Sequence, residues 1–493
     1  MKEGEHMNIS VSENLDNKQE VLALGLFDDD IDYYSSYNKA LSDELKDAIS
    51  KKSFELEFGR TYTTKIDSTG YKRIIVVALG KKQDLTIDRV RRAMNRIVAF
   101  MKSLKLYSFT TDIVALCASQ SLKNSDVARA AAEGLILSEY SFEKYKIKKS
   151  VDKGFNAVLQ GVHDLSPYII QGTIIANATN YAKDLINEPA IVATPEFIES
   201  QARKIKSPKI KVKVMDKKEL VQKGLNAILA VSAGSDKSPK LIFIEYNGAG
   251  KAPYTAIIGK GITFDSGGYN LKPTGAIEDM KCDMAGAAAI LGTIIASSKL
   301  GIKKNILGVI PACENMINGS AIKPGDIVRA YNGKTIEILN TDAEGRLILA
   351  DAISYAEKNY SPEKIIDLAT LTGACIVALG HHASGIFSND EGLSKELIDA
   401  GEQSHDRLWP LPLFEEYMDD MEGDITDLKN SAKIADRTAG AIRGAVFISK
   451  FVEKSAWAHI DIAGPAYLSE PHEYNQKYAT GCGVRLLTYY FMK

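Results

Sequence analysis

Apolar residues in the first third of the chain fall into short continuous runs, and longer amphipathic stretches lie between them. Each run is short and mostly aliphatic, which predicts strands buried on both faces of a sheet. The stretches at residues 87–105 and 125–143 repeat their apolar positions at the spacing of one helix face. This alternation predicts a self-contained α/β unit. The predicted strands lie at residues 21–27, 73–79, 112–117 and 155–160.

The same alternation of strand and helix patterns resumes after residue 193. Thr194 followed by Pro195 predicts the start of a helix, because threonine caps free N–H groups and proline fits the first turn. Strands that alternate with helices predict a largely parallel sheet with helices on both faces. The predicted strands of this region lie at residues 209–214, 241–246, 255–258, 305–310 and 364–369.

A long helical pattern at residues 166–185 lies between the two regions and stops before Pro189, because proline cannot continue a helix. We therefore expect an N-terminal α/β domain at residues 1–164, a connecting helix at 165–190 and a C-terminal α/β domain at 191–493. The predicted fold class is α/β, with a mostly parallel central sheet flanked by helices in the C-terminal domain.

Composition narrows the class of protein. The chain has a formal net charge of −2 and a pI near 6.4, so no global field draws it to nucleic acid or to an anionic membrane. No apolar run approaches the roughly 18 residues that span a bilayer, and the first eight residues lack the apolar core of a secretory signal. The five cysteines are scattered without paired spacing, which indicates reduced thiols rather than disulfides or a zinc ribbon. We expect a cytoplasmic protein.

The chemistry concentrates in the octapeptide NTDAEGRL at residues 340–347, which lies between a strand pattern and a buried helix pattern. In extended backbone, residues i and i+2 point the same way, so Asp342 and Glu344 would project together. Gly345 would then let the chain turn into the helix. Two neighbouring carboxylates require a cation or a shared proton between them. The alternative is a polar loop that caps a helix.

A second polar stretch follows the predicted strand at residues 255–258 and precedes a helix pattern of small residues. It carries Lys260, Asp265, Lys272 and Asp283, which would lie on the loop between that strand and that helix. Ligands of open α/β sheets bind at this edge. The four carboxylates of the two stretches are hard oxygen ligands, and such a set suits two divalent cations about 3.5–4 Å apart.

Both stretches resemble the leucyl (cytosol) aminopeptidase family of dinuclear metallopeptidases. The octapeptide matches the family's signature, and the spacing of Lys260, Asp265, Lys272 and Asp283 fits as well. Shorter matches continue to residue 487, so the resemblance covers residues 165–493 in detail and the N-terminal third in outline. It implies a catalytic C-terminal domain and an N-terminal assembly domain away from catalysis. It also implies a homohexamer built as a dimer of trimers.

The resemblance implies that one metal ion is held by Lys260, Asp265, Asp283 and Glu344, and the other by Asp265, Asp342 and Glu344. Manganese or zinc is expected, and magnesium or cobalt also suits oxygen-rich sites. The ions would activate a water for attack on the peptide carbonyl. Lys260 would bind as the neutral amine, which two nearby cations favour. Without the resemblance, a salt bridge between Lys260 and Asp265 is the favoured alternative.

Two cationic residues have implied catalytic roles. Lys272 would stabilise negative charge that develops on the carbonyl oxygen, and Arg346 would hold a bicarbonate that carries a proton to the leaving amine. The alternatives are a solvated loop lysine and an arginine paired with a nearby carboxylate. The pocket for the first side chain of the substrate would be formed by Met280, Leu371, Gly373, Ala463 and Ala466.

The implied reaction is removal of leucine and other apolar residues from peptides with a free N-terminus. Ala466 and the pair Tyr269-Asn270 depart from the family's usual residues, which leaves the side-chain preference open. A narrow dipeptidase for a substrate such as cysteinyl-glycine is one alternative. An additional DNA-binding role is another, and the near-neutral charge argues against it. We expect His381, His382, His459 and Cys282 to be structural rather than metal ligands.

Overall fold

The computed structural model describes residues 7–493 except 16–18, 121, 149–153, 162 and 433–437. It divides into two compact units, one of residues 1–177 with 471–476 and one of residues 178–470 with 477–493. The division falls within α5 (Ser166–Asn187), and the domain limits expected at residues 164 and 190 stay a prediction. The first six residues, where we expect no secretory signal, lie outside the described residues.

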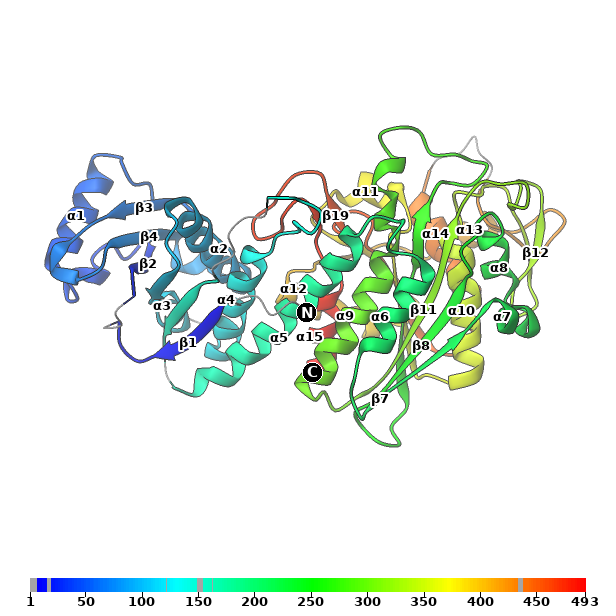
Figure 1. Cartoon of the computed structure of the whole chain (residues 1–493), viewed down its shortest axis with the longest axis horizontal. Helices are drawn as coiled ribbons and strands as arrows, with labels where there is room; N and C mark the ends of the chain where they lie inside the picture. Colours follow the sequence, from blue (N-terminus) through cyan, green and yellow to red (C-terminus); the bar gives the residue numbers. More distant parts are fainter. Residues whose placement is uncertain (1–6, 16–18, 121, 149–153, 162, 433–437) are drawn as a thin grey trace. The chain divides into compact units, whose positions relative to one another are not determined.

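The first unit contains a six-stranded sheet that is parallel except for the edge strand β3 (Figure 1). The inner strand β2 is apolar throughout because both of its faces are covered, and it is buried at all seven positions. The strand order is β1 (Asn8–Ser12), β6 (Asn156–Gln160), β5 (Ser108–Thr111), β2 (Val21–Phe27), β4 (Arg73–Gly80) and β3 (Thr61–Thr64). Its helices are α1 (Lys39–Ser50), α2 (Ile87–Leu104), α3 (Ile113–Ala118) and α4 (Asn124–Glu139).

One predicted strand of this unit is wrong. Residues 112–117 were expected to be a strand, but the strand β5 lies before them and the apolar run forms the short helix α3. The run is buried in either conformation, so the hydrophobic pattern cannot distinguish a short helix from a short strand. Asp112, at the junction of β5 and α3, accepts hydrogen bonds from the Gly25 N–H and the Tyr34 hydroxyl.

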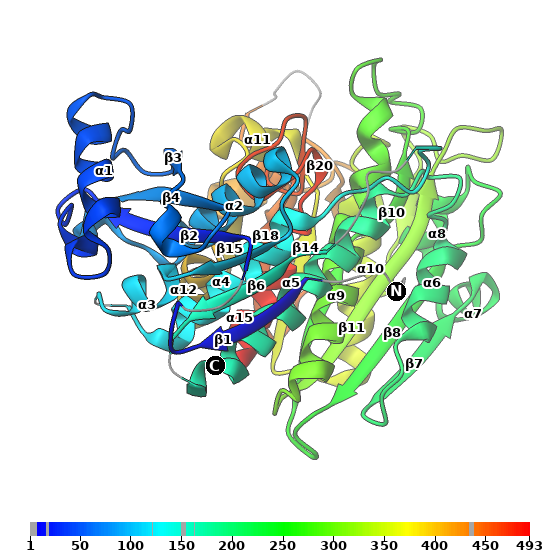
Figure 2. The ribbon, with the colours of Figure 1, turned by 60° about the vertical axis from the view of Figure 1, so that its left-hand side comes forward.

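The second unit contains a nine-stranded mixed sheet whose centre is parallel (Figure 2). Strands β18, β14, β9 and β11 run parallel, whereas β8 is antiparallel to β11 and β15 is antiparallel to β18. The order is β16 (Leu408–Pro410), β15 (Ser384–Ser388), β18 (Ala456–Asp461), β14 (Lys364–Ala369), β9 (Tyr254–Gly259), β11 (Asn305–Asn315), β8 (Lys240–Asn247) and β7 (Ile210–Met215), with β10 (Gly261–Asp265) beside β11.

Helices cover both faces of this sheet. Leu307 and Val309 of β11 pack in one apolar cluster with residues of α10 (Gly345–Tyr360). A side chain at Gly308 would instead approach Ile290 of α9 (Ala285–Leu300), and successive residues of a strand face opposite sides. The stretch Ile277–Leu300 has the length and composition to cross a membrane, but 83% of its most apolar window is buried inside the protein.

The strand β11 extends beyond its predicted end at residue 310. Pairing with β9 ends at Val309, and pairing with β10 begins at Ala312. Pro311 lies in the gap between the two ladders, where a strand can tolerate a residue without an N–H. The strand therefore continues to Asn315.

The remaining elements surround this sheet. A small sheet contains β12 (Ile327–Arg329), β13 (Thr335–Glu337) and β17 (Leu428–Lys429), and another contains β19 (Tyr467–Leu468) and β20 (Tyr478–Ala479). The other helices are α6 (Pro195–Lys204), α7 (Lys217–Lys223), α8 (Asn226–Ser232), the 3₁₀ helix η5 (Ile277–Met284), α11 (Gly373–Leu379), α12 (Glu391–Ser404), α13 (Glu415–Asp419), α14 (Gly440–Ser449) and α15 (Val484–Met492). The side chain of Thr194 caps α6 as predicted, by accepting a hydrogen bond from Phe197 N–H.

Candidate metal centre

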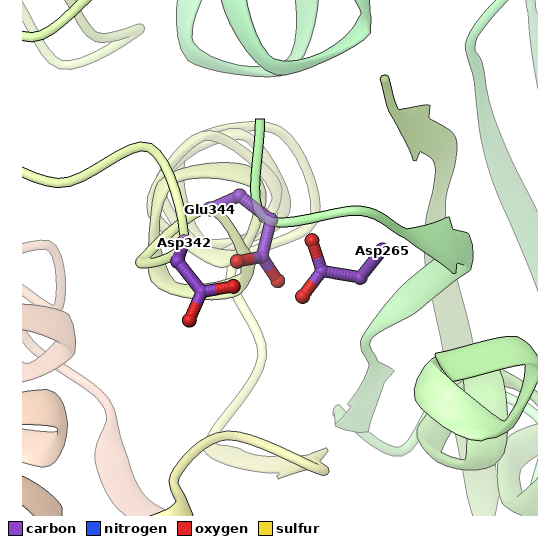
Figure 3. A group of neighbouring side chains, drawn as sticks. All are labelled: Asp265, Asp342 and Glu344. Atoms are coloured by element: carbon purple, nitrogen blue, oxygen red, sulfur yellow. The ribbon is translucent and has the colours of Figure 1, made fainter. Parts of the chain in front are cut away.

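Three carboxylates from two separate segments converge at the carboxyl edge of the large sheet. Asp265 ends β10, Asp342 lies in the turn that follows β13, and Glu344 immediately precedes α10. One oxygen of each lies within 4.8 Å of the others, and Figure 3 shows the three carboxylates turned toward one another. Asp265 and Glu344 are buried, and Asp342 is half-buried.

The local backbone differs from the sequence-based prediction. Asp342 lies in a turn, and Glu344 already has helical φ and ψ of −81° and −37°, so extended-strand alternation does not explain their convergence. The second stretch is also not a simple loop. Lys260 joins β9 to β10, and Asp283 lies in the 3₁₀ helix η5.

Two lysines separate the carboxylates. Lys260 Nζ lies 2.8 Å from Asp283 Oδ2, 2.8 Å from Glu344 Oε1 and 2.9 Å from the Thr370 carbonyl oxygen. Burial lowers the pKa of Lys260, but the neighbouring carboxylates raise it by a larger amount. The pKa of Lys260 therefore lies above its usual value. The alternative salt bridge between Lys260 and Asp265 is therefore not the pair that forms.

Lys272 forms the pair with Asp265 instead. Its Nζ lies 2.8 Å from Asp265 Oδ2 and 2.5 Å from Asp342 Oδ1. Burial alone would lower the pKa of Lys272, yet Asp265 and Asp342 raise it above its usual value. The ammonium group is therefore charged at neutral pH, and Lys272 is not a freely solvated loop lysine.

The residues present fit divalent cations. Asp283 Oδ2, Asp342 Oδ1 and Glu344 Oε1 are buried atoms that lie close to a lysine nitrogen, yet they accept no well-oriented hydrogen bond from any residue that the structure describes. Burial and the neighbouring Glu344 together raise the pKa of Asp265 to about 6, against the opposing effect of the two lysines. Carboxylates clustered this closely repel one another and are stabilised by cations between them.

Glycines let these segments approach one another. A Cβ at Gly345 would lie 2.6 Å from Lys260 Cε and 2.7 Å from Lys260 Nζ. Gly345 does not have a positive φ, so its lack of a side chain makes room for Lys260 rather than for a turn. Gly267 and Gly268 do have positive φ, and a Cβ at Gly268 would lie 2.8 Å from Thr341 Oγ1.

Arg346 is the first charged residue inside α10, and it is 8% exposed. Its Nη1 donates a 2.8 Å hydrogen bond to the Asn430 carbonyl, whereas its buried Nε has no acceptor in the described parts of the chain. Burial lowers the pKa of Arg346 to about 10, so the guanidinium keeps its charge. No carboxylate of a described residue lies within ion-pair distance, so the alternative of a simple arginine–carboxylate pair is not observed there.

The residues expected to form the substrate pocket lie at the ends of β14 and β18 and in η5. The backbone N–H groups of Leu371 and Ala463 both donate to Asp461 Oδ1 at 3.1 Å, so the structure brings these two residues together. Gly373 begins α11 with open space beside it, whereas Ala466 is only 1% exposed. Met280 is half-buried, three residues before Asp283.

Several polar residues that support these segments were not predicted from the sequence. The Asn315 amide donates to Asp265 Oδ1 at 2.8 Å, and Thr370 Oγ1 donates to Asp283 Oδ1 at 2.7 Å. Asn430 Oδ1 accepts hydrogen bonds from the N–H groups of residues 339 and 340. Asn315 was missed because the predicted strand ended five residues too early. A polar residue at the carboxyl end of a parallel strand is a candidate site residue, and this position was the signal available in the sequence.

The histidines and Cys282 have contacts typical of structural residues. His459 Nδ1 lies 2.6 Å from Asp367 Oδ1 in the core, and His381 Nδ1 lies 2.7 Å from the Gly464 carbonyl. Burial raises the pKa of the Cys282 thiol to about 12, which disfavours the thiolate that would bind a metal.

Comparison with known proteins finds similarity along nearly the whole chain. The model of the cytosol aminopeptidase family, catalytic domain, matches residues 180–488, and that of the N-terminal domain matches residues 23–149. A probable cytosol aminopeptidase of Geotalea uraniireducens (strain Rf4) is 39% identical over 476 residues, which cover 94% of this chain and 93% of that protein. One of Geobacter sulfurreducens (strain ATCC 51573 / DSM 12127 / PCA) is 44% identical over 428 residues, or 85% and 84% of the two chains.

A solved structure is similar over the same length. The bottromycin maturation enzyme BotP in complex with Mn aligns with a TM-score of 0.84 and 29% sequence identity. The alignment covers 96% of this chain and 99% of that chain, so both units share their fold with that enzyme.

Proposed function

This chain belongs to the cytosol aminopeptidase family of metal-dependent aminopeptidases, and we propose that it uses two divalent ions to remove leucine and other apolar residues from peptides. The observation that carries this proposal is the cluster of four carboxylates and two lysines, in which three carboxylate oxygens lack a well-oriented donor among the described residues. Its substrates are peptides with a free N-terminus.

One ion would be held by Lys260, Asp265, Asp283 and Glu344, and the other by Asp265, Asp342 and Glu344. The similarity to an enzyme whose structure contains Mn supports manganese, and zinc suits the same ligands. Bound there, the ions would polarise the peptide carbonyl and supply a water with a pKa near 7. Lys260 would bind as an amine, so metal binding would release the proton that Asp283 and Glu344 now stabilise.

Lys272 would act on the substrate rather than on the ions. Its ammonium group is held by Asp265 and Asp342 at the edge of the cluster, and its side chain is 17% exposed. Negative charge develops on the carbonyl oxygen during hydrolysis, and a fixed positive charge in a water-poor site stabilises it. The neighbouring carboxylates keep Lys272 protonated for this role.

Arg346 would hold a bicarbonate ion. The buried Nε without an acceptor supports this assignment, because an arginine fork binds small planar anions with two parallel hydrogen bonds. Bicarbonate there would supply a proton carrier between the water and the leaving amine. A side chain at Gly444 would lie 3.0 Å from Leu371 Cδ2 and 3.5 Å from Arg346 Nη2, so Arg346 lies close to the proposed substrate pocket.

The pocket for the first side chain would be lined by small and apolar groups, which favours leucine-like residues. Leu371 and Ala463 are joined through Asp461, Gly373 leaves open space, and the buried Ala466 would lie at the base. Met280 would complete the pocket from η5. We further propose a cytoplasmic homohexamer, a dimer of trimers, in which the N-terminal unit serves assembly.

The test is leucine release from a leucyl dipeptide by chelator-stripped protein, with and without added Mn²⁺ or Zn²⁺. We expect release only after metal is added, and no release from the N-acetylated peptide, because recognition requires a free amine. A panel that includes cysteinyl-glycine separates a broad aminopeptidase from a narrow dipeptidase. Absence of leucine release with every metal would contradict the proposal.

A further inference from the structure

We propose that Asn315 and Asn270 are positioning residues that clamp the Asp265 segment to the octapeptide segment at the separation that shared metal ions require. The inference rests on the proposed function, because the ions would bind ligands from both segments. Asp265 and Asp342 are far apart in sequence, so contacts between the segments must fix their relative positions. The lysine bridges cannot do this alone, because they contact the ligand oxygens that the ions would use.

Asn315 provides the first part of the clamp. Its side-chain amide donates to Asp265 Oδ1 at 2.8 Å and to the Thr341 carbonyl at 3.0 Å, so both of its N–H groups are used. The backbone carbonyl of Asn315 accepts a hydrogen bond from the Ser266 N–H at 3.0 Å. Asn315 is 1% exposed and ends β11, which places this donor on the central sheet. One rigid residue therefore contacts Asp265 and the peptide group that directly precedes Asp342.

The hydrogen bond also orients the Asp265 carboxylate. Asn315 and the Gly267 N–H both donate to Oδ1, at 2.8 and 2.9 Å, whereas Oδ2 faces Lys272. Neutral donors thus fix one oxygen and leave the other directed toward the charged cluster. Partners of metal-binding carboxylates commonly set the orientation of the ligand in this way.

Asn270 provides the second part through reciprocal bonds with Thr341. Asn270 Oδ1 accepts the Thr341 N–H at 2.9 Å, and Thr341 Oγ1 accepts the Asn270 N–H at 2.9 Å. Thr341 Oγ1 also donates to the Gly267 carbonyl at 2.7 Å. The two segments are in tight contact here, because a Cβ at Gly268 would lie 2.8 Å from Thr341 Oγ1 and 3.2 Å from Asn315 Oδ1.

The test is a calorimetric titration of the chelator-stripped full chain with Mn²⁺. Asn315→Leu keeps a branched side chain of similar size and removes both donors, whereas Asn315→Ala also removes the volume. Asn270→Ala removes the acceptor of the second part. Asn226→Ala is the matched control, because it also loses one amide-to-carbonyl hydrogen bond, of 3.0 Å to Arg329, at an exposed position.

We expect both Asn315 variants to bind Mn²⁺ roughly 10- to 100-fold more weakly than the wild type, with Asn270→Ala near the lower end of that range. Excess Mn²⁺ should restore kcat and leave KM for the dipeptide unchanged, because the proposed defect is in holding the ion. Asn226→Ala should bind Mn²⁺ as the wild type does. Thermal unfolding of the stripped proteins verifies that each variant is folded.

Mn²⁺ affinity within twofold of the wild type in Asn315→Leu and Asn270→Ala would overturn the inference. So would recovery of affinity in Asn315→Leu but not in Asn315→Ala, since that would indicate a role in packing alone. If the Asn315 variants do not fold, Asn270→Ala decides the question. If the wild type binds Mn²⁺ and the variants do not, but no peptide is cleaved, the proposed function fails and the clamp stands. If the wild type binds no Mn²⁺, both are wrong.

Discussion

Asp112 in the first unit and Asp265 in the second occupy equivalent places, since each lies at the carboxyl end of a parallel strand and is 2% exposed. Their surroundings differ. Asp112 accepts hydrogen bonds from two neutral donors, Gly25 N–H on one oxygen and the Tyr34 hydroxyl on the other. Asp265 has neutral donors on one oxygen only, and its other oxygen faces Lys272 within the acidic cluster.

The difference shows what separates a structural carboxylate from a candidate metal ligand. Burial raises the pKa of both groups, to about 7 for Asp112 and to about 6 for Asp265, so the pKa does not distinguish them. The charge of their partners does distinguish them, because both oxygens of Asp112 accept from neutral donors whereas Asp265 Oδ2 faces the Lys272 ammonium group. An ion could reach Asp112 only by replacing two hydrogen bonds, whereas oxygens in the Asp265 cluster face charges and lack well-oriented donors among the described residues.

The largest expected effect is at Glu344. Glu344→Ala removes a proposed ligand of both ions, and turnover of a leucyl dipeptide should fall by roughly 10³-fold or more, because bound metal supplies several kcal/mol of transition-state stabilisation. Glu357→Ala, within the helix α10 that Glu344 precedes, is the control. Glu357 accepts hydrogen bonds from three backbone N–H groups at residues 453–455, so its loss should reduce stability but not turnover per folded molecule. Full activity of Glu344→Ala would show that Glu344 is not a required metal ligand.

A smaller effect is expected when the ligands remain but their geometry changes. The Cβ introduced by Gly345→Ala would displace Lys260, and a displacement of about 1 Å in a catalytic site costs roughly 10²-fold in kcat. Gly319→Ala is the matched control, since nothing lies within 4 Å of its added Cβ. Steady-state kinetics at saturating Mn²⁺ measures both variants, and equal rates would show that the position of Lys260 is not critical.

Asp112 should affect stability rather than catalysis, with a defined pH dependence. Its folded-state pKa of about 7 lies above the unfolded value of about 3.9, so the folded state binds more protons between these limits. Its contribution to stability is therefore full in acid and is lost as the pH rises toward 7, with a slope of at most about 1.4 kcal/mol per pH unit.

Asp112→Asn cannot titrate at this position and removes that slope. Unfolding of stripped wild type and Asp112→Asn, compared from pH 5 to pH 7, should show the wild type losing stability relative to the variant as the pH rises. Turnover per folded molecule should be the same in both. A parallel pH dependence of the two proteins would show that Asp112 stays ionised when buried.

The smallest effect is expected at Cys282, which precedes Asp283 but is not a proposed ligand. Cys282→Ala should leave Mn²⁺ affinity within twofold of the wild type, because burial keeps the thiol protonated. Calorimetric titration with Mn²⁺ compares Cys282→Ala with Asp283→Ala. The second variant should lose most of its Mn²⁺ affinity. A large loss of affinity in Cys282→Ala would place sulfur in the metal centre.

The buried strands of both units could be predicted because a continuous aliphatic run is typical of a parallel strand that is covered on both faces. Strand β2 agrees with its predicted limits at residues 21–27, whereas residues 112–117 form a helix because a short buried run carries no period of its own. The end of β11 could not be predicted, because only its two neighbouring ladders explain why Pro311 is tolerated.

The sequence by itself determined the family and the set of charged residues, because the octapeptide and the spacing of Lys260, Asp265, Lys272 and Asp283 are local patterns. Only the tertiary structure decided which charges pair. Lys260 contacts Asp283 and Glu344, whereas Lys272 contacts Asp265 and Asp342.

The tertiary structure also decided the contacts of Asn315 and Gly345. Asn315 supports Asp265 from a strand 50 residues away, and Gly345 makes room for Lys260, which joins β9 to β10. Such contacts depend on the distance between segments remote in sequence, and that distance is set by the packing of the whole sheet.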